Sequence, residues 1–412
     1  MKKLSSLFLT LALLFSFVSA VQAEAKPISV WVEDEQVQLG ALQPIMEKGT
    51  TLVPAKLLLQ KLDFQVTWDQ KNKVITGKKE GLVLLFQIDN LGAMVNETEQ
   101  GLLAAPKLVK GTAYIPLRSV SEAAGYEVTW NKEQRSISLQ AKEPSRGFLW
   151  KVEKAGSTVY LLGSIHIANE AMYPLRPEIQ DAYEASDYLV VEADISKMNN
   201  EEVQKLVMDL SVYKDNTTLK DHISDEAYKK LGEILKENGA AENALDTYKA
   251  WSVSSTIDFL ATSQAGYDAG IGIDAHFLEQ SNANNKPILE LESIEYQLRL
   301  FDGFSDKLQE EMVNASIENY YAEDSGIDAL TDMWVTGDEK QLLELTEATS
   351  ANEEFNQALL TDRNAPMVEK ITGYLNDAAN KTYFVVVGAA HMLGENGIVP
   401  QLEEKGFTVT RQ

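Results

Sequence analysis

Two stretches of the sequence share one pattern, YLLGSIHIA at residues 160–168 and VVVGAAHML at residues 385–393. In each, an apolar run typical of a buried strand reaches a glycine, and a histidine follows three positions later. Continuous apolar strands of this kind occur in α/β sheets that are covered on both faces. In such open sheets, ligands bind beyond the carboxyl ends of the strands. The chain has only 4 histidines, so we predict that His166 and His391 meet in one crevice.

Further strands and helices alternate around these two stretches. We expect strands at 148–154 (FLWKVEK), 187–195 (DYLVVEADI) and 286–293 (KPILELES), in addition to the strands that end at the two glycines. The stretch 224–239 begins with a serine cap and two acids and stops at Asn-Gly, which is typical of a helix. The alternation predicts an α/β layer fold with a largely buried sheet.

The first part of the chain contains an internal repeat with an offset of 62 residues. GTTLVPAKLLLQKLDFQVTWDQKNKVITG begins at Gly49, and GTAYIPLRSVSEAAGYEVTWNKEQRSISL begins at Gly111. Each copy reads as a Gly-Thr turn, a short strand, a helix started by proline, and a hairpin. One copy is too small to bury its apolar face alone, so we expect the two to pack as a pair. We therefore predict a small α+β domain of two internal repeats at 28–140, a polar linker at 139–147, and a second domain at 146–412.

The composition describes an acidic chain with an export signal. Residues 1–23 combine Lys2 and Lys3 with an apolar run and the small-residue site Val21-Gln22-Ala23, which is the pattern of a cleaved signal peptide; a retained membrane anchor is the alternative. Loss of both lysines would change the net charge from −25 to −27. This charge argues against nucleic acid as a partner, because phosphates attract lysine and arginine. We expect a secreted or extracytoplasmic protein associated with the cell envelope.

The two histidines indicate a metal centre. The chain has no cysteine, and imidazole and carboxylate remain as ligands for a transition metal. Two histidines rarely suffice, so a carboxylate is expected as a third ligand beside an open position for water. Glu192, which interrupts the apolar run LVVEAD at a strand end, is the first candidate. Glu292 in LELES is the second, with Glu290 on the same face; for each, an acidic strand end in water is the structural alternative.

Other residues can support such a site. Asp274 in GIGIDAHF either caps a helix or orients a site group, and His276 either packs structurally or supports the site from behind. Arg363 in TDRNAPM can hold a substrate carboxylate or a glutamate of the site, unless it is only a solvated helix-start arginine. The sequence has no G-x-S-x-G, H-E-x-x-H or P-loop motif. Ser164 lies close to His166 in sequence, but we disfavour a Ser–His hydrolase, because nearby strand residues point either to opposite faces or to separate positions along the same face.

Residues 28–140 resemble the copper amine oxidase N-terminal-like domain of exported bacterial proteins. The resemblance rests on the V-P and I-P-L-R elements and on the two V-T-W elements. Residues 24–145 contain no histidine and no cysteine, so we expect no copper site. We interpret this domain as an accessory or adhesion module in contact with the cell wall or envelope.

Residues 146–412 resemble the TraB/GumN family, which includes the Tiki metalloproteases. The motifs that carry this resemblance are LLGSIHIA, the acid in VVEAD, GID at 272–274, KPILELESIEYQ at 286–297, RN at 363–364 with Met367, and VVVGAAHMLGENGIVPQLEEKGFTV at 385–409. The resemblance implies a mixed-sheet α/β domain with helical insertions, of the Tiki/erythromycin-esterase-like kind. It also implies a metal-dependent peptidase with His166 and His391 in the site and Glu192 as ligand or general base. Asn364 would lie behind the ligands or against the substrate.

Two functions remain open from the sequence. The first is an exported peptidase that uses Mn, Co or Zn, in which an activated water attacks a peptide carbonyl of a peptide or protein substrate. Glu192 would then accept or relay the proton, with Glu292 as the second candidate for this role. The second is a non-catalytic peptide- or pheromone-binding or inhibitory protein held at the cell envelope. A pure binder needs no set of two histidines and an acid, and this favours the peptidase.

Overall fold

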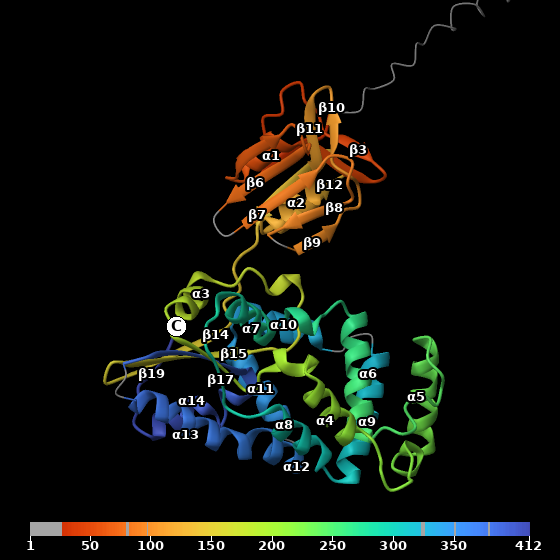
Figure 1. The fold of residues 1–412 in the computed structure, drawn as a ribbon, viewed down its shortest axis with the longest axis vertical. Coiled ribbons are helices and arrows are strands. Elements are labelled where there is room, and N and C mark those ends of the chain that lie inside the picture. The colour runs from red at the N-terminus through yellow and green to blue at the C-terminus, as the bar shows by residue number, and fades with distance from the viewer. Residues whose placement is uncertain (1–26, 80–81, 97, 323–325, 350–351, 378–379) are drawn as a thin grey trace, which may run out of the picture. The chain divides into compact units, whose positions relative to one another are not determined.

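The computed structural model describes residues 27–412 except 80–81, 97, 323–325, 350–351 and 378–379, and the predicted signal peptide lies outside the described residues. The chain divides into two compact units, Met1–Lys142 and Glu143–Gln412, each with its own hydrophobic core (Figure 1). Within the described part of the chain, no helix is long and apolar enough to cross a membrane.

In its described residues, 27–142 except 80–81 and 97, the first unit has three sheets and two short helices. The sheets have the orders β12-β13-β1-β2, β10-β11-β4-β3 and β5-β6-β7-β8-β9. The elements are β1 (Ser29–Val32), β2 (Glu35–Gln36), β3 (Ile45–Glu47), β4 (Thr50–Pro54), α1 (Ala55–Lys61), β5 (Gln65–Asp69), β6 (Val74–Lys79), β7 (Leu82–Gln87), β8 (Gly92–Val95), β9 (Thr98–Gly101), β10 (Lys107–Val109), β11 (Thr112–Pro116), α2 (Leu117–Ala123), β12 (Tyr126–Asn131) and β13 (Ser136–Ala141).

The predicted repeat is present as two copies of one motif, β4–α1–β5–β6 and β11–α2–β12–β13. Strands β4 and β11 pair antiparallel, with Val53 opposite Ile115. These two residues are equivalent in the repeat, so the pairing is centred on a local twofold axis that relates the copies. Leu59 of α1 and Val120 of α2 are buried in one core. The two copies therefore pack as a pair, because neither could cover its apolar face alone.

The second unit alternates strands with helices and carries long helical insertions. Its elements are β14 (Phe148–Lys154), β15 (Ser157–Ser164), α3 (Pro177–Glu184), β16 (Tyr188–Val191), α4 (Glu201–Ser211), α5 (Asp225–Glu237), α6 (Ala250–Gln264), α7 (Ile273–Asn284), β17 (Ile288–Glu290), α8 (Ile294–Asp302), α9 (Asp306–Tyr321), α10 (Ile327–Thr336), α11 (Glu339–Thr349), α12 (Glu353–Asn356), α13 (Asp362–Asn376), β18 (Thr382–Gly388), α14 (Ile398–Glu404) and β19 (Val409–Arg411). The expected helix at 224–239 is α5, and its Ser224 side chain accepts the N–H of Ala227.

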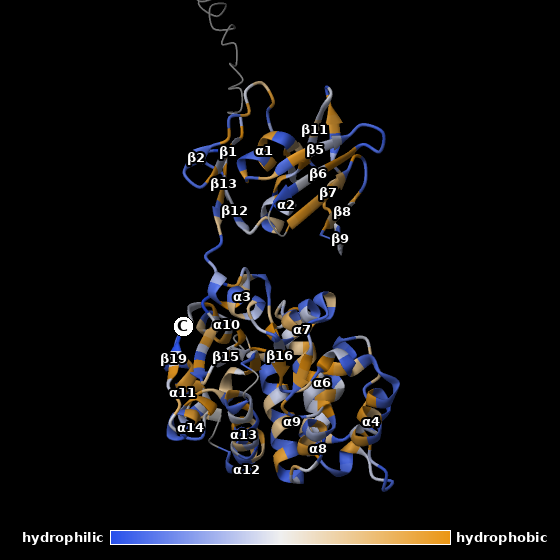
Figure 2. Cartoon of the chain, turned by 60° about the vertical axis from the view of Figure 1, so that its left-hand side comes forward, coloured by the Kyte–Doolittle hydropathy of each residue, from blue (hydrophilic) through white to orange (hydrophobic). Residues whose placement is uncertain are grey.

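One mixed sheet of six strands, in the order β17-β16-β18-β15-β14-β19, forms the centre of the second unit. Strands β17, β16, β18 and β15 are mutually parallel, and β14 runs antiparallel to β15. Helices such as α6, α8 and α9 mix hydrophobic and hydrophilic residues along their length (Figure 2), as helices with one buried face do. The predicted mixed-sheet α/β class is confirmed, and the carboxyl ends of four parallel strands share one edge.

The two G-x-x-H motifs are neighbours in this sheet. Strand β18 lies between β15 and β16, and it pairs in parallel with β15 so that Gly163 faces Val387 and Ser164 faces Gly388. The motifs are therefore aligned with an offset of one residue. The two histidines therefore follow the same edge of the sheet and are neighbours there, just after the last paired residues of β15 and β18.

The predicted linker at 139–147 is shorter in the structure. Strand β13 continues to Ala141. At the other end, the N–H of Ser145 donates to the carbonyl of Pro174, and the N–H of Arg176 donates to the carbonyl of Ser145. These backbone hydrogen bonds attach the end of the polar stretch to the second unit. Polarity marked a connection correctly, but it did not show where ordered backbone pairing begins.

Candidate active site

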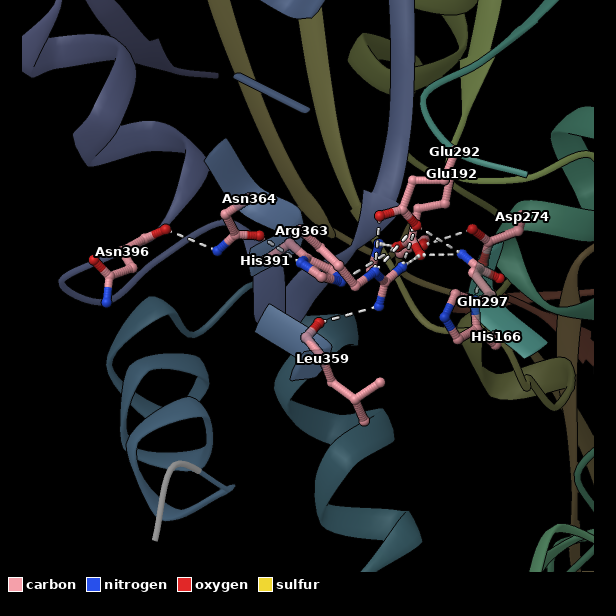
Figure 3. A network of polar contacts seen from close by, with 12 residues as sticks. His166, Glu192, Asp274, Glu292, Gln297, Leu359, Arg363, Asn364, His391 and Asn396 are labelled. Atoms are coloured by element: carbon pink, nitrogen blue, oxygen red, sulfur yellow. Dashed lines mark hydrogen bonds and ion pairs between the residues drawn. The ribbon is translucent and has the colours of Figure 1, made fainter. Parts of the chain in front are cut away.

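Four predicted site residues follow the carboxyl ends of four neighbouring parallel strands. Across the edge of the sheet these are Glu292 after β17, Glu192 after β16, His391 after β18 and His166 after β15. The N–H of Glu292 donates to the carbonyl of Glu192 at 2.7 Å, which extends the β16–β17 pairing beyond the strands. The parallel topology thus brings together residues that are far apart in sequence (Figure 3).

His166 is oriented by Asp274. Its Nδ1 lies 2.9 Å from Oδ2 of Asp274, and a carboxylate only accepts, so Nδ1–H donates and Nε2 of the neutral ring carries the lone pair. Asp274 raises the pKa of His166 to about 9, although the side chain is 64% exposed and solvent screens part of this effect. The Ser164 hydroxyl donates to Oδ1 of Asp274 at 2.8 Å. Ser164 therefore supports the carboxylate and makes no Ser–His pair.

Backbone hydrogen bonds hold Asp274 close to the carboxyl end of β15. The N–H of Ile273 donates to the carbonyl of Ile165 at 3.0 Å, and Ala168 and Asp268 exchange two backbone hydrogen bonds. Helix α7 begins directly after Gly272, so Asp274 lies in the first turn, where an acid is favoured. A Cβ on Gly272 would lie 2.2 Å from the carbonyl oxygen of His166. Glycine is therefore required for this close approach.

His391 is oriented by Asn364. Its Nδ1 lies 2.6 Å from Oδ1 of Asn364, whose amide nitrogen donates to the carbonyl of Asn396 at 2.7 Å. The hydrogen bond to Asn396 fixes the orientation of the Asn364 amide, so Nδ1–H of His391 is the donor to Asn364. Nε2 of His391 faces Glu192, whose Oε1 is 3.8 Å away. His391 is only 4% exposed, and this burial lowers its pKa to about 4.

Arg363 joins the two glutamates. Its Nη2 donates to Glu192 at 2.6 Å and to Glu292 at 2.8 Å, and its Nε donates to Glu292 at 3.0 Å. Arg363 lies in the first turn of α13, as expected for a helix-start arginine, but it is buried and not solvated. Burial alone would raise the pKa of Glu192, but the two histidines, Arg363 and the N–H of Gly388 lower it to about 2. Glu192 is therefore ionised at neutral pH.

Gly388 lies at the centre of these groups. Its N–H donates to Oε1 of Glu192 at 2.6 Å. A methyl group placed on Gly388 would lie 3.2 Å from this oxygen, 3.6 Å from Nε2 of His166 and 3.6 Å from Cδ2 of His391. The two rings and the carboxylate therefore surround one small space that exists because residue 388 has no side chain.

The donor set fits a metal only in part. Both histidines engage Nδ1 and leave Nε2 available, as metal-binding histidines usually do. Glu192, however, accepts from Gly388 with one oxygen and from Arg363 with the other. In the part of the chain that the structure describes, no group of three or more His, Cys, Asp or Glu side chains is arranged to hold a metal ion. Among the described residues, the arrangement thus offers two imidazole Nε2 atoms and no third protein group that is free to join them.

For two residues, His276 and Gln297, the structure adds to what the sequence predicted about the site. His276 lies apart from this network, because its Nε2 faces the side-chain amides of Gln180 and Gln280 at 3.4 and 2.6 Å. Gln297 of α8 was not among the predicted residues, yet its amide donates to Glu192 at 3.2 Å and to Glu292 at 3.1 Å. The sequence signals for Gln297 were its place at the end of the motif KPILELESIEYQ at 286–297 and its position one turn into a serine-capped helix that follows a strand end.

Comparison with known proteins identifies relatives of both units. The model of the TraB/PrgY/gumN family matches residues 148–411, and the model of the copper amine oxidase N-terminal domain matches residues 31–139. An uncharacterized protein, YbaP of Escherichia coli (strain K12), is 24% identical over 243 residues, which cover 59% of this chain and 86% of the relative. The metalloprotease TIKI homolog of Nematostella vectensis is 20% identical over 319 residues, covering 64% of this chain and 66% of the relative. A protease inhibitor of Brevibacillus choshinensis is 29% identical over 134 residues, which cover 31% of this chain and 40% of the relative.

Proposed function

Because the chain belongs to the TraB/PrgY/gumN family, we propose that it is an exported, metal-dependent peptidase whose site is centred on His166 and His391. Relatives named as metalloproteases support the reaction class. The observation that carries the proposal is the space beside Gly388, which two imidazoles and an ionised carboxylate surround. We expect the protein to act outside the cytoplasm on a peptide or protein substrate.

His166 and His391 would hold the metal through Nε2, because both Nδ1 atoms are engaged by Asp274 and Asn364. A divalent ion such as Mn, Co or Zn supplies, when bound, a Lewis acid for the peptide carbonyl and an acidified water. Asp274 and Asn364 keep the rings in the tautomer that a metal requires. Protons compete with the metal at His166, because Asp274 raises the pKa of this ring.

Glu192 would act through Oε1, as a third metal ligand or as a general base. Its Oε2 is committed to Arg363 and Gln297, whereas Oε1 accepts the Gly388 N–H at 2.6 Å and points toward His391. The two histidines, Arg363 and the N–H of Gly388 hold the pKa of Glu192 low and keep it ionised, which either role requires. Glu292, held by Arg363 through both of its oxygens, is a positioning residue in this scheme.

The test is Glu192→Gln, with metal content and peptide turnover measured on the same preparation. If Glu192 is the base, metal content should remain and turnover should fall by about 10²–10⁴. If it is a ligand, both should fall. Glu295→Gln is the matched control, because Glu295 is an exposed acid of α8 that pairs with Arg299 of the same helix. A chelator should abolish turnover, and Mn, Co or Zn should restore it; full activity in Glu192→Gln, or turnover unaffected by chelator, would contradict the proposal.

A second candidate function is a non-catalytic protein that binds or inhibits a peptide or pheromone at the cell envelope. One observation favours it, namely that both oxygens of Glu192 are already hydrogen-bonded and no third ligand is formed among the described residues. Peptides that bind the metal-supplemented protein without being cleaved would support this alternative over the peptidase.

A further inference from the structure

The first unit contains two pockets that have the same construction. One pocket, of about 350 Å³, is lined by Lys56 at the start of α1 and Trp68 of β5, and also by Leu108 of β10 and Thr112 of β11. Trp68 is 38% exposed and Leu108 is 48% exposed. The pocket therefore needs both halves of this unit, because its lining combines α1 and β5 of the first copy with the β10–β11 hairpin at the start of the second.

The second pocket, of about 370 Å³, repeats this arrangement with the copies exchanged. Arg118 at the start of α2 and Trp130 of β12 come from the second copy, and Met46 and Thr50 come from the first. Trp130 is 46% exposed and Met46 is 58% exposed. Each of these four residues differs from its counterpart in the first pocket by the repeat offset of 62.

The twofold axis between β4 and β11 explains why the two repeat copies exchange roles between the two pockets. Because Val53 faces Ile115, the β3–β4 hairpin of one copy lies beside the helix of the other, and α1 contacts β11 as α2 contacts β4. Figure 2 shows α1 next to β5 and β6, and α2 next to β12. An exposed tryptophan and a cation thus line the same pocket twice, at equivalent places in the two repeats.

The lining points to one class of ligand. An exposed indole offers a flat apolar face on which the C–H face of a ring can pack, a threonine hydroxyl can both donate and accept, and a lysine or arginine attracts an acid. A sugar ring that carries a carboxylate or a phosphate uses all three. An apolar peptide side chain would use only the indole and the aliphatic wall, and would leave unexplained why a cation and a threonine occur in both pockets.

The distribution of charge agrees with an acidic ligand. Residues 27–142 contain 13 Lys and Arg and 13 Asp and Glu, whereas residues 143–412 contain 21 and 48. Residues 27–142 therefore carry no net charge in a chain of net charge −25. An acidic glycan is repelled by the second unit but not by the first. Lys56 gives it a local attraction at one pocket, and Arg118 does so at the other, where its exposed ion pair with Glu122 at 3.0 Å is weakened by solvent.

We propose that the first unit binds acidic glycans in these two pockets, with one acidic sugar ring against Trp68 and another against Trp130. The two sites are equivalent, so the intact protein has two binding sites for a short acidic oligosaccharide. This binding is independent of the peptidase site, and neither proposal depends on the other.

The experiment titrates the intact protein with trigalacturonate and follows heat and tryptophan fluorescence. We expect two sites per chain, one site in Trp68→Ala and in Trp130→Ala, and no binding in the double variant; each substitution should weaken its own site at least about tenfold. Trp68→Phe and Trp130→Phe should retain part of the binding, because they keep a ring. Leu91→Ala is the control, since Leu91 is 57% exposed in the same unit and lines neither pocket.

Two further ligands, a neutral sugar and an acidic peptide, test whether the pockets select acidic sugars. Neutral maltotriose should bind at least about tenfold more weakly than trigalacturonate, and Lys56→Glu with Arg118→Glu should remove that difference. Equal binding of the neutral sugar would overturn the acidic specificity. Binding of an acidic peptide in place of either sugar, no binding of trigalacturonate, or binding that the folded double tryptophan variant keeps would overturn the proposal. Circular dichroism checks that each variant is folded.

Discussion

Gly388 allows two imidazoles and a carboxylate to face one another, because it adds no atoms to the space between them. An alanine there has an allowed backbone conformation, since φ is −48° and ψ is 135°. Its methyl group would contact the carboxylate and both rings at 3.2–3.6 Å. The residue therefore controls the site more than it controls the stability of the fold.

We predict that Gly388→Ala lowers metal content and peptide turnover by at least about tenfold, while the thermal unfolding midpoint changes little. The methyl group takes the space in which a metal or water would lie. Gly373→Ala in α13 is the control, because a Cβ there would meet nothing within 4 Å. Unchanged metal content and turnover in Gly388→Ala would show that this space is not the site.

His391 gives the second prediction, a dependence of stability on pH. Its pKa is about 4 in the folded protein and about 6.5 in an unfolded chain. As the pH falls, the unfolded chain binds the proton first. The contribution of His391 is therefore complete above about pH 6.5 and is lost as the pH falls through about 4.

Chelator-treated protein should lose up to about 3 kcal/mol of its free energy of unfolding from this source between pH 6.5 and pH 4. Urea unfolding at several pH values in this range measures the slope. His391→Gln should reduce the slope. His222→Gln controls for the loss of a histidine elsewhere, because His222 contacts Thr217 and Tyr213 and takes no part in the network around Gly388. Identical slopes in His391→Gln and the unsubstituted protein would contradict the predicted role of burial.

At the scale of elements, helix α13 holds the ends of β16 and β17 together through one arginine. The Arg363 side chain is 8% exposed, and the carboxylates of Glu192 and Glu292 are 8% and 6% exposed. Burial opposes the charge of Arg363, but its two carboxylate partners raise its pKa. The pairing is therefore strong only while all three groups are present.

Arg363→Gln should destabilise the protein by about 3–5 kcal/mol, because two buried carboxylates would lose their cation. Arg299→Gln, which removes an exposed partner of Glu295 on α8, should cost about 0.5 kcal/mol or less. Urea unfolding of the two variants gives the comparison. A similar small loss in both would mean that Arg363 does not hold the two strand ends together.

At the scale of the whole molecule, the two units have separate cores and, we propose, separate tasks. The second unit contains every residue of the network around Gly388. We predict that a fragment of residues 143–412 keeps the turnover of a small peptide. The fragment should begin at Glu143, because Ser145 is buried and pairs with Pro174 and Arg176. A folded but inactive fragment, measured beside an active full chain, would contradict this division.

Local patterns in the sequence determine much of this protein. The apolar runs before Gly163 and Gly388 predict strands, and the constant offset between the two repeats predicts their pairing. These features depend on residues close in sequence, such as alternation, caps and turns, so they can be read directly. The convergence of His166, His391 and Glu192 also follows, because parallel strands end at one edge.

Only the tertiary structure decided how these pieces meet. The insertion of β18 between β15 and β16 depends on packing across the whole sheet, and no local pattern specifies it. The same holds for Gln297 between two glutamates, for His276 outside the network, and for the burial of Arg363. The partner of a side chain is set by residues that are distant in sequence. The residue type therefore showed only that Arg363 could bind a carboxylate, and the fold showed that it binds Glu192 and Glu292.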